Sequence, residues 1–338
     1  MTHEFKNLLT ISEIWKNNGV RSVLATVVSL EGSSYRRPGV RMLISEMGEM
    51  HGAVSGGCVE KEVLFQAESV FKTGIPKVIT YDGRFRLGCE GVLYILLEPF
   101  EPDSKLTELL KNSFANRKTF QIQSFFKAQF SEDHRYGSFA EIEDLTYPFR
   151  SSLNKNQSVD VNVFEQNLKS IFQLYIFGAE HDAVKLCEIS SKMGWEVHII
   201  AAPDEQKTIE YFQGATSLTT PLIENIDVSN IGENTAVVLM SHSLNKDVQY
   251  LLALRNTKPA YLGLLGPSKR REKLLNELLN YFPDTDEDFF DRIYGPTGLD
   301  IGAESASEIA VSIVAEILSV TRNSELKPLK DKSGNIHS

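Results

Sequence analysis

The residues with the clearest chemical potential lie in one stretch near the N-terminus, GSSYRRPGVRMLISEMGEMHGAVSGGCVE. Arg36 and Arg37 carry guanidinium groups, whose paired donors suit phosphate and other oxyanions. Gly56 and Gly57 have no Cβ, so the backbone there can approach a ligand closely. Cys58 follows directly as a soft nucleophile or metal ligand. Oxyanion donors beside a thiol suit a small molecule that carries phosphate together with sulfur or a metal.

Each of these residues also has an ordinary structural interpretation. A free cysteine such as Cys58 is most often a small buried hydrophobic side chain. Arg36, Arg37 and Arg41 could form a solvated basic edge, as runs of charge usually do. Pro38-Gly39 predicts a turn, which would hold the arginines at a fixed place in a loop and favours an anion site.

The composition of the 338 residues is that of a globular protein with room for two domains. No apolar run approaches the ~20 residues of a membrane helix, and the N-terminus does not resemble a secretory signal. The three cysteines (Cys58, Cys89, Cys187) form no CxxC pair, so neither a disulfide framework nor a zinc site is expected, and a cytoplasmic location fits best. The net charge of −10 argues against nucleic acid as a partner, and it requires local positive groups to hold any anionic ligand.

Residues 1–150 are expected to form an α+β domain. Apolar residues at helical spacing predict helices over 5–19 and 60–74. Strands are expected at 22–32, 40–48 and 92–100, with further strand-like runs in 118–147. The polar stretch RSSLNKNQSVD (150–160) has no clear periodicity, and we expect a linker over 151–170.

From residue 171 onward, strands and helices alternate. Strands are expected at 173–178, 196–202, 236–242 and 260–266, and helices at 183–194, from Ser268, and up to Val320. The last helix begins with Ser305-Ala-Ser-Glu308, which has the form of a capping box. This alternation predicts a Rossmann-like, doubly wound parallel sheet over 171–325, followed by a flexible tail over 326–338.

Several stretches together resemble the XdhC/CoxI family, the accessory factors of xanthine dehydrogenase and related molybdenum hydroxylases. They are GSSYRRPGVRM, GAVSGGCVE, RLGCEGVLYILLEPF, LYIFGAEHDA and YGPTGLDIGAESASEIAVSIVAEI, in the family's order and across nearly the whole chain. The resemblance implies a chaperone that binds the molybdenum cofactor (molybdopterin), protects it during sulfuration and delivers it to a client hydroxylase. It implies a maturation factor rather than an enzyme with turnover, with a cysteine desulfurase as a second partner and a homodimer as the assembly.

The resemblance also assigns roles to residues of the first domain. Arg36 and Arg37 are expected to hold the pterin phosphate, and Ser34 and Ser55 could donate hydrogen bonds to the pterin or the phosphate. Cys58 either contacts molybdenum or only lines the pocket. The expected cofactor-binding residues are Ser34, Arg36, Arg37, Ser55, Gly56, Gly57, Cys58, Glu60 and Cys89.

Two of these residues have open alternatives. Glu60 could orient the cofactor, or it could only begin a helix, where the dipole favours a carboxylate. Cys89 lies in LGCEG, a family motif, with Glu90 where the family more often has glycine, so both a site role and a core role stay open. Cys187 lies on the apolar face of a predicted helix and is expected to be packing.

The expected second domain carries an altered dinucleotide fingerprint. The pattern G-x-G-x-x-G/A reads here Gly178-Ala179-Glu180-His181-Asp182-Ala183, so Glu180 replaces the glycine that lets the pyrophosphate approach. A carboxylate about 5 Å from a phosphate charge costs roughly 3 kcal/mol at an effective dielectric of about 20. Ala201 stands where the family usually has the ribose-binding Asp, and Asp204 lies further into the loop. NAD(P) is therefore not expected as a cofactor. An NAD(P)-dependent oxidoreductase is the alternative function, and a scaffold without a ligand is a third.

Further candidates lie where doubly wound sheets bind ligands, at the carboxyl ends of strands. His242 and Asp247 match a family motif, although a lone His is more often structural. A basic helix start such as Ser268-Lys269-Arg270 is a candidate anion site. The turn GPTGLDIG could face a ligand or could simply need glycines at positive φ. The candidates of this domain are Gly178, His181, Asp182, His242, Ser268, Lys269 and Arg270.

Overall fold

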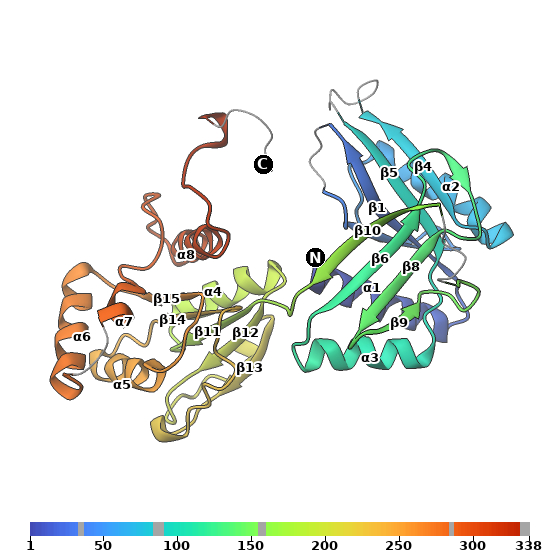
Figure 1. The fold of residues 1–338 in the computed structure, drawn as a ribbon. Helices are drawn as coiled ribbons and strands as arrows, with labels where there is room; N and C mark the ends of the chain where they lie inside the picture. Colours follow the sequence, from blue (N-terminus) through green and yellow to red (C-terminus); the bar gives the residue numbers. More distant parts are fainter. Residues whose placement is uncertain (33–36, 84–90, 155–159, 284–286, 332–338) are drawn as a thin grey trace. The chain divides into compact units, whose positions relative to one another are not determined.

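The structure is a computed structural model that describes residues 1–32, 37–83, 91–154, 160–283 and 287–331 (Figure 1). The described chain forms two compact units, Met1–Ser170 and Ile171–Asp331. The first unit is α+β and the second is a parallel α/β unit, which confirms the predicted fold class. No helix in these described ranges is long and apolar enough to cross a membrane.

The first unit is built on an antiparallel sheet with the strand order β3-β2-β1-β5-β4-β7. Its strands are β1 (Ser22–Glu31), β2 (Arg41–Ser45), β3 (Met50–Gly52), β4 (Lys77–Asp82), β5 (Val92–Pro99) and β7 (Ser131–Glu132). Helix α2 (Cys58–Thr73) covers one face, where Val63 and Val70 share a core with Val23 and Ile95. The helix ends at Gly74, whose left-handed φ of 69° fits the predicted glycine stop.

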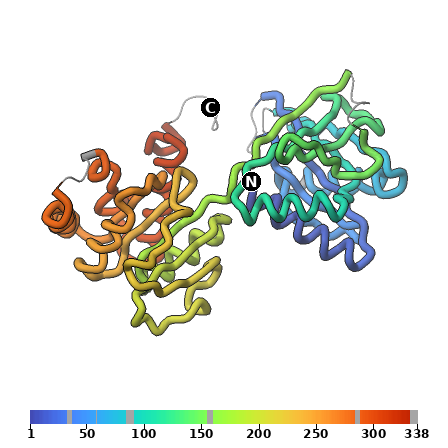
Figure 2. Tube along the Cα trace, turned by 60° about the horizontal axis from the view of Figure 1, so that its bottom comes forward, coloured from blue at the N-terminus to red at the C-terminus, as the bar shows by residue number. Residues whose placement is uncertain are grey.

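The other face of this sheet is covered by two helices and a second sheet. Helices α1 (Thr2–Asn17) and α3 (Ser104–Ala115) lie side by side (Figure 2), and their apolar residues share a core with Leu24 and Leu43. The second sheet is antiparallel and has the order β10-β6-β8-β9. Its strands are β6 (Phe120–Phe126), β8 (Gly137–Ile142), β9 (Leu145–Pro148) and β10 (Asn162–Leu168). The ring of Phe5 on α1 stacks on Phe149 at 5.9 Å between centroids.

Strand β10 corrects the expected linker over 151–170. Its residues pair with β6 over the whole strand, from Asn162 opposite Phe126 to Leu168 opposite Phe120. The segment NVFEQNL buries only Gln166 and Leu168, so its sequence is too polar to indicate a strand without knowledge of its partner. The first unit therefore extends to Ser170.

The second unit contains a parallel sheet with the order β13-β12-β11-β14-β15-β16. Its strands are β11 (Gln173–Phe177), β12 (Glu196–Ile200), β13 (Ala215–Thr219), β14 (Thr235–Leu239), β15 (Tyr261–Leu264) and β16 (Ile293–Tyr294). Numbered along the unit, the strands have the order 3-2-1-4-5-6 of dinucleotide-binding sheets. The order in which the chain adds strands to the sheet reverses between β11 and β14.

Helices cover both faces of the parallel sheet (Figure 1). Helices α4 (His181–Lys192) and α8 (Ala306–Thr321) pack on one face, and α5 (Leu244–Leu254), α6 (Ser268–Tyr281) and α7 (Glu287–Asp291) pack on the other. Short 3₁₀ helices are η3 (Ile209–Tyr211), η4 (Ile223–Asn225) and η5 (Leu329–Asp331). The predicted capping box is confirmed, because Ser305 and Glu308 bond each other's backbone N–H at the start of α8. Cys187 is fully buried in α4, as expected for a packing residue.

Candidate functional site

The two motif segments of the first unit meet at one end of a hairpin. Strands β2 and β3 are antiparallel neighbours, with Met42 opposite Gly52. The turn 37–40 therefore enters the hairpin at the same end where the chain leaves it toward 53–57 and the start of α2. Arg37 is exposed in this turn. The hairpin thus brings Arg37 and the segment that leads to Gly56 and Gly57 to the same end of the sheet.

The Gly56–Gly57 pair lies in open space at the start of α2. A Cβ added to either glycine would meet no atom within 4 Å, so packing inside the protein does not require glycine there. Gly57 is the N-cap and has no side chain to cap the first turn, where the Val59 N–H donates to the Gly56 carbonyl at 3.0 Å; the other N–H groups of such a helix start can bind an anion. Glu60 lies in that first turn and is half-buried, as is Ser55 ahead of it.

Several predicted site residues cannot be placed. Ser34, Arg36 and Cys89 lie outside the described residues. The backbone of Cys58 is the first residue of α2, and its side chain lies outside the description. Among the described residues, no group of three or more His, Cys, Asp or Glu side chains could hold a metal ion. The roles expected for these four residues stay predictions.

Arg41 does not belong to a solvated basic edge. Its side chain is only 7% exposed, and its guanidinium lies over the Phe5 ring, 5.4 Å from the centroid. Its Nη1 donates to the carbonyl of Gly39 at 3.0 Å and to Oε1 of Gln166 at 2.5 Å. Burial lowers the pKa of Arg41 to about 10, so the group stays charged at neutral pH.

A cavity of about 340 Å³ adjoins Arg41 at this end of the hairpin. Helix α1 contributes one wall, and the hairpin with its flanking residues contributes the other. The lining residues are Glu4, Asn7, Leu8, Ile11, Val40, Arg41, His51, Gly52 and Ala53. The cavity thus lies between the turn that carries Arg37 and the segment that leads to Gly56 and Gly57.

In the second unit, Gly178 follows β11 at the point where the order of the parallel strands reverses. It has a φ of +133°, and an added Cβ would lie 2.5 Å from the Met240 carbonyl oxygen. Glycine is therefore required for the close approach of β11 and β14. This packing explains the first glycine of the fingerprint without a nucleotide.

The structure brings three of the second-unit candidates to the strand ends. Nε2 of His242 lies 3.5 Å from Oδ2 of Asp182. Buried Asp247 accepts from Ser241 Oγ at 2.5 Å and from Arg270 Nη2 at 2.7 Å, which links β14 to α6. The joining role of Asp247 was not predicted, since its burial depends on tertiary packing. The exposed residues His181, Ser268 and Lys269 join no described contact in this cluster.

A cavity of about 530 Å³ lies at the ends of β11 and β12. Glu180 and Asp204 both line it, with Lys246 Nζ 3.5 Å from Asp204 Oδ1. Asp204 lines the cavity from the loop after β12, and the expectation that it does not replace the ribose-binding Asp stays a prediction. Three carboxylates, those of Glu180, Asp204 and Glu205, line the cavity against two lysines, Lys207 and Lys246, and this balance opposes an anionic pyrophosphate.

The GPTGLDIG turn is held by α8. The Gly298 N–H donates to Glu316 Oε2 at 2.8 Å, and Ser312 Oγ donates to the Leu299 carbonyl at 2.6 Å. Gly298 has φ +105°, and an added Cβ would collide with Ser312. These contacts favour the structural interpretation of this turn.

Comparison with known proteins agrees with this architecture. The pattern of the XdhC Rossmann domain matches residues 174–317, and that of the XdhC and CoxI family matches residues 15–82. The chain belongs to the XdhC/CoxI family. It is 27% identical to a probable xanthine dehydrogenase subunit of Bacillus subtilis, over 92% of this chain and 97% of that protein.

Two further relatives cover nearly the whole chain. The molybdenum cofactor insertion chaperone PaoD of Escherichia coli is 26% identical, over 96% of this chain and 91% of its own length. The crystal structure of a xanthine dehydrogenase from Bacillus halodurans matches with a TM-score of 0.76 and 25% identity, covering 95% of this chain and 98% of that one. The XdhC/CoxI protein described here therefore shares both units with its relatives.

Proposed function

We propose that this XdhC/CoxI protein is a maturation factor that binds the molybdenum cofactor as cargo and passes it to a molybdenum hydroxylase. The observation that carries the proposal is the hairpin β2–β3, which brings the arginine turn, the cavity beside Arg41 and the Gly56–Gly57 start of α2 to one place. The name of the PaoD relative, a cofactor insertion chaperone, supports the same role.

The residues present fit such a cargo. The anionic phosphate calls for arginine donors and helix N–H groups, and both occur at this hairpin end. The unhindered glycines allow close approach of a flat heterocycle. A thiol at position 58 would be a soft contact for the metal or its sulfur ligands. The cargo supplies the redox-active metal, and the chain would hold and shield it.

The finer steps of the proposal concern partners. Protection during sulfuration requires a sulfur donor, for which we propose a cysteine desulfurase. Delivery requires contact with the client hydroxylase, and a homodimer is the assembly we propose for the carrier. Light scattering on the purified chain would test the dimer.

Loading and transfer test the proposed function directly. Purified full-length protein is incubated with released molybdenum cofactor, passed through a desalting column, and analysed for bound molybdenum and pterin. The loaded protein is then mixed with cofactor-free hydroxylase. We expect near-stoichiometric molybdenum retention and activation of the hydroxylase beyond that given by free cofactor. Retention no better than that of serum albumin would contradict the proposal.

A further inference from the structure

We infer that the buried guanidinium of Arg41 is the anion-binding group of the cavity beside it, and that it takes the phosphate of a small phosphate ester. The inference rests on the proposed function, because the cargo's phosphate is the expected occupant. It assigns that phosphate to Arg41, a residue outside the Arg36–Arg37 pair to which the resemblance pointed.

The first support is the unused edge of the guanidinium. Nη1 donates hydrogen bonds to Gly39 and Gln166. Nε and Nη2 are buried and have no acceptor among the described residues. These two nitrogens form one edge of the planar group, the edge that pairs bidentately with phosphate or carboxylate. Buried donors normally have partners, so two missing ones on a single edge indicate an absent acceptor.

The residue opposite Arg41 also has a buried polar atom without a described hydrogen-bond partner. Thr26 on β1 pairs with Arg41 across the sheet, so both side chains lie on the face toward α1. Its Oγ1 is fully buried and also lacks a described partner. Thr26 does not line the cavity, so its hydroxyl is a second unsatisfied group on this face of the sheet, and the ligand is assigned to the guanidinium edge alone.

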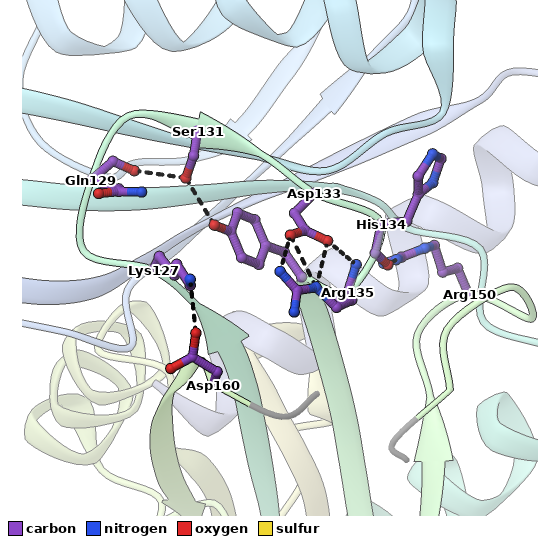
Figure 3. A network of polar contacts seen from close by, with 9 residues as sticks. Lys127, Gln129, Ser131, Asp133, His134, Arg135, Arg150 and Asp160 are labelled. Atoms are coloured by element: carbon purple, nitrogen blue, oxygen red, sulfur yellow. Dashed lines mark hydrogen bonds and ion pairs between the residues drawn. The ribbon is translucent and has the colours of Figure 1, made fainter. Parts of the chain in front are cut away.

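The local charge balance also favours an anion. Glu98 on β5 is fully buried, but its carboxylate is occupied by the Ser138 N–H at 2.8 Å and Ser138 Oγ at 2.6 Å. Arg150 is a second buried guanidinium, and its Nη2 donates to the His134 carbonyl at 2.6 Å (Figure 3). Nη1 of Arg150 lies 3.9 Å from Glu98 Oε2, so two buried guanidinium groups share one buried carboxylate, and burial raises the pKa of Glu98.

The cavity has the size and walls for such a ligand. Its volume of about 340 Å³ lies within the range of small-molecule sites. Leu8, Ile11 and Val40 offer apolar contact to a flat ring. At Gly52, with φ +80°, a Cβ would lie 2.5 Å from the Arg41 carbonyl oxygen, so this wall cannot carry a side chain without moving Arg41.

Variants of Arg41 test the inference in the full-length protein. Arg41→Lys keeps the charge but loses the two-donor edge, and Arg41→Met removes both. Arg21→Met is the matched control, since Arg21 pairs with Glu46 at the surface, outside the cavity. The probes are inorganic phosphate, followed by ³¹P NMR, and released molybdenum cofactor, followed by molybdenum retention. We expect both Arg41 variants to bind each probe about tenfold or more weakly, with the control unchanged.

A variant at the cavity rim tests the inference through a gain of binding, which loss of the fold could not produce. Glu4 is exposed on α1 and lines the cavity. Its carboxylate raises the pKa of Arg41 by charge attraction. Glu4→Gln removes a competing carboxylate and should tighten phosphate binding by roughly twofold or more. The fold of every variant is checked by circular dichroism.

The outcomes separate this assignment from the proposed function. Cofactor binding that is equal in wild type and Arg41→Lys would overturn the assignment and leave the proposed function standing. Arg41-dependent phosphate binding without cofactor retention would support the assignment and contradict the proposed function. If wild type binds neither probe and Glu4→Gln changes nothing, buried water satisfies the guanidinium edge and the inference is overturned.

Discussion

At the scale of single residues, two cysteines at different places in their helices lead to opposite predictions. Cys187 is fully buried in α4, and burial raises the pKa of its thiol to about 12, so it stays protonated and unreactive. Cys58 is the first residue of α2 and follows Gly56 and Gly57, and its role as a soft ligand stays a prediction from the sequence.

The Cys58→Ala variant should lose cofactor retention or sulfuration while it keeps its fold. Alanine removes the soft ligand with little loss of volume, and we expect at least about tenfold less molybdenum bound after desalting. Cys187→Ala is the matched control and should retain molybdenum as wild type does, at the cost of some stability. Equal retention and equal hydroxylase activation by Cys58→Ala and wild type would refute the role of the thiol.

At the scale of elements, local signals predicted most of the fold. The glycine stop at Gly74 and the capping box at Ser305 are local, and both helices end or begin where these residues indicated. Strand β10 was not predicted because it is stabilised by pairing with β6, whose residues lie 36 or more positions earlier in the sequence. Arg41 is similar: its burial depends on Phe5 and on Gln166, 125 residues away. The sequence thus indicated the segments of the candidate site, whereas tertiary packing decides that Arg41 is buried.

A prediction at this scale concerns the junction of β11 and β14. Gly178→Ala forces a Cβ against the Met240 carbonyl and a φ of +133° that alanine rarely adopts. We expect the second unit to lose about 1–3 kcal/mol of its free energy of unfolding. Gly232→Ala is the control, because an added Cβ there meets nothing within 4 Å, and it should be nearly neutral or slightly stabilising. Urea denaturation monitored by far-UV circular dichroism measures both, and equal midpoints would contradict the packing argument.

At the scale of the whole molecule, the strand order of a dinucleotide-binding sheet occurs without the matching phosphate site. Glu180 and Asp204 line the cavity at the strand ends, in a chain of net charge −10. We therefore expect NAD and NADP to bind no more tightly than about 1 mM, because a carboxylate near the pyrophosphate costs roughly 3 kcal/mol. Glu180→Gly should tighten binding, whereas Glu188→Gln on the same helix, outside the cavity, should not. Low-micromolar binding by wild type in calorimetry would instead favour the oxidoreductase.

The division of the chain into units gives a prediction about where binding lies. The cavity, the hairpin β2–β3 and the start of α2 all belong to Met1–Ser170, so a fragment of residues 1–170 should bind released molybdenum cofactor within about threefold of the full chain. A fragment of residues 1–160 should bind far less. It lacks β10, which leaves β6 as an unpaired edge, and it lacks Gln166, which holds Nη1 of Arg41.

The fragment of residues 171–338 serves as the comparison, and circular dichroism checks that each piece is folded. Molybdenum retention is measured on all three fragments and on the full chain at equal concentration. Retention by residues 171–338 alone, or equal retention by the 1–160 and 1–170 fragments, would contradict the assignment of the site to the first unit. If the assignment holds, the second unit acts after binding, in delivery to the client, and its removal should lower hydroxylase activation more than it lowers retention.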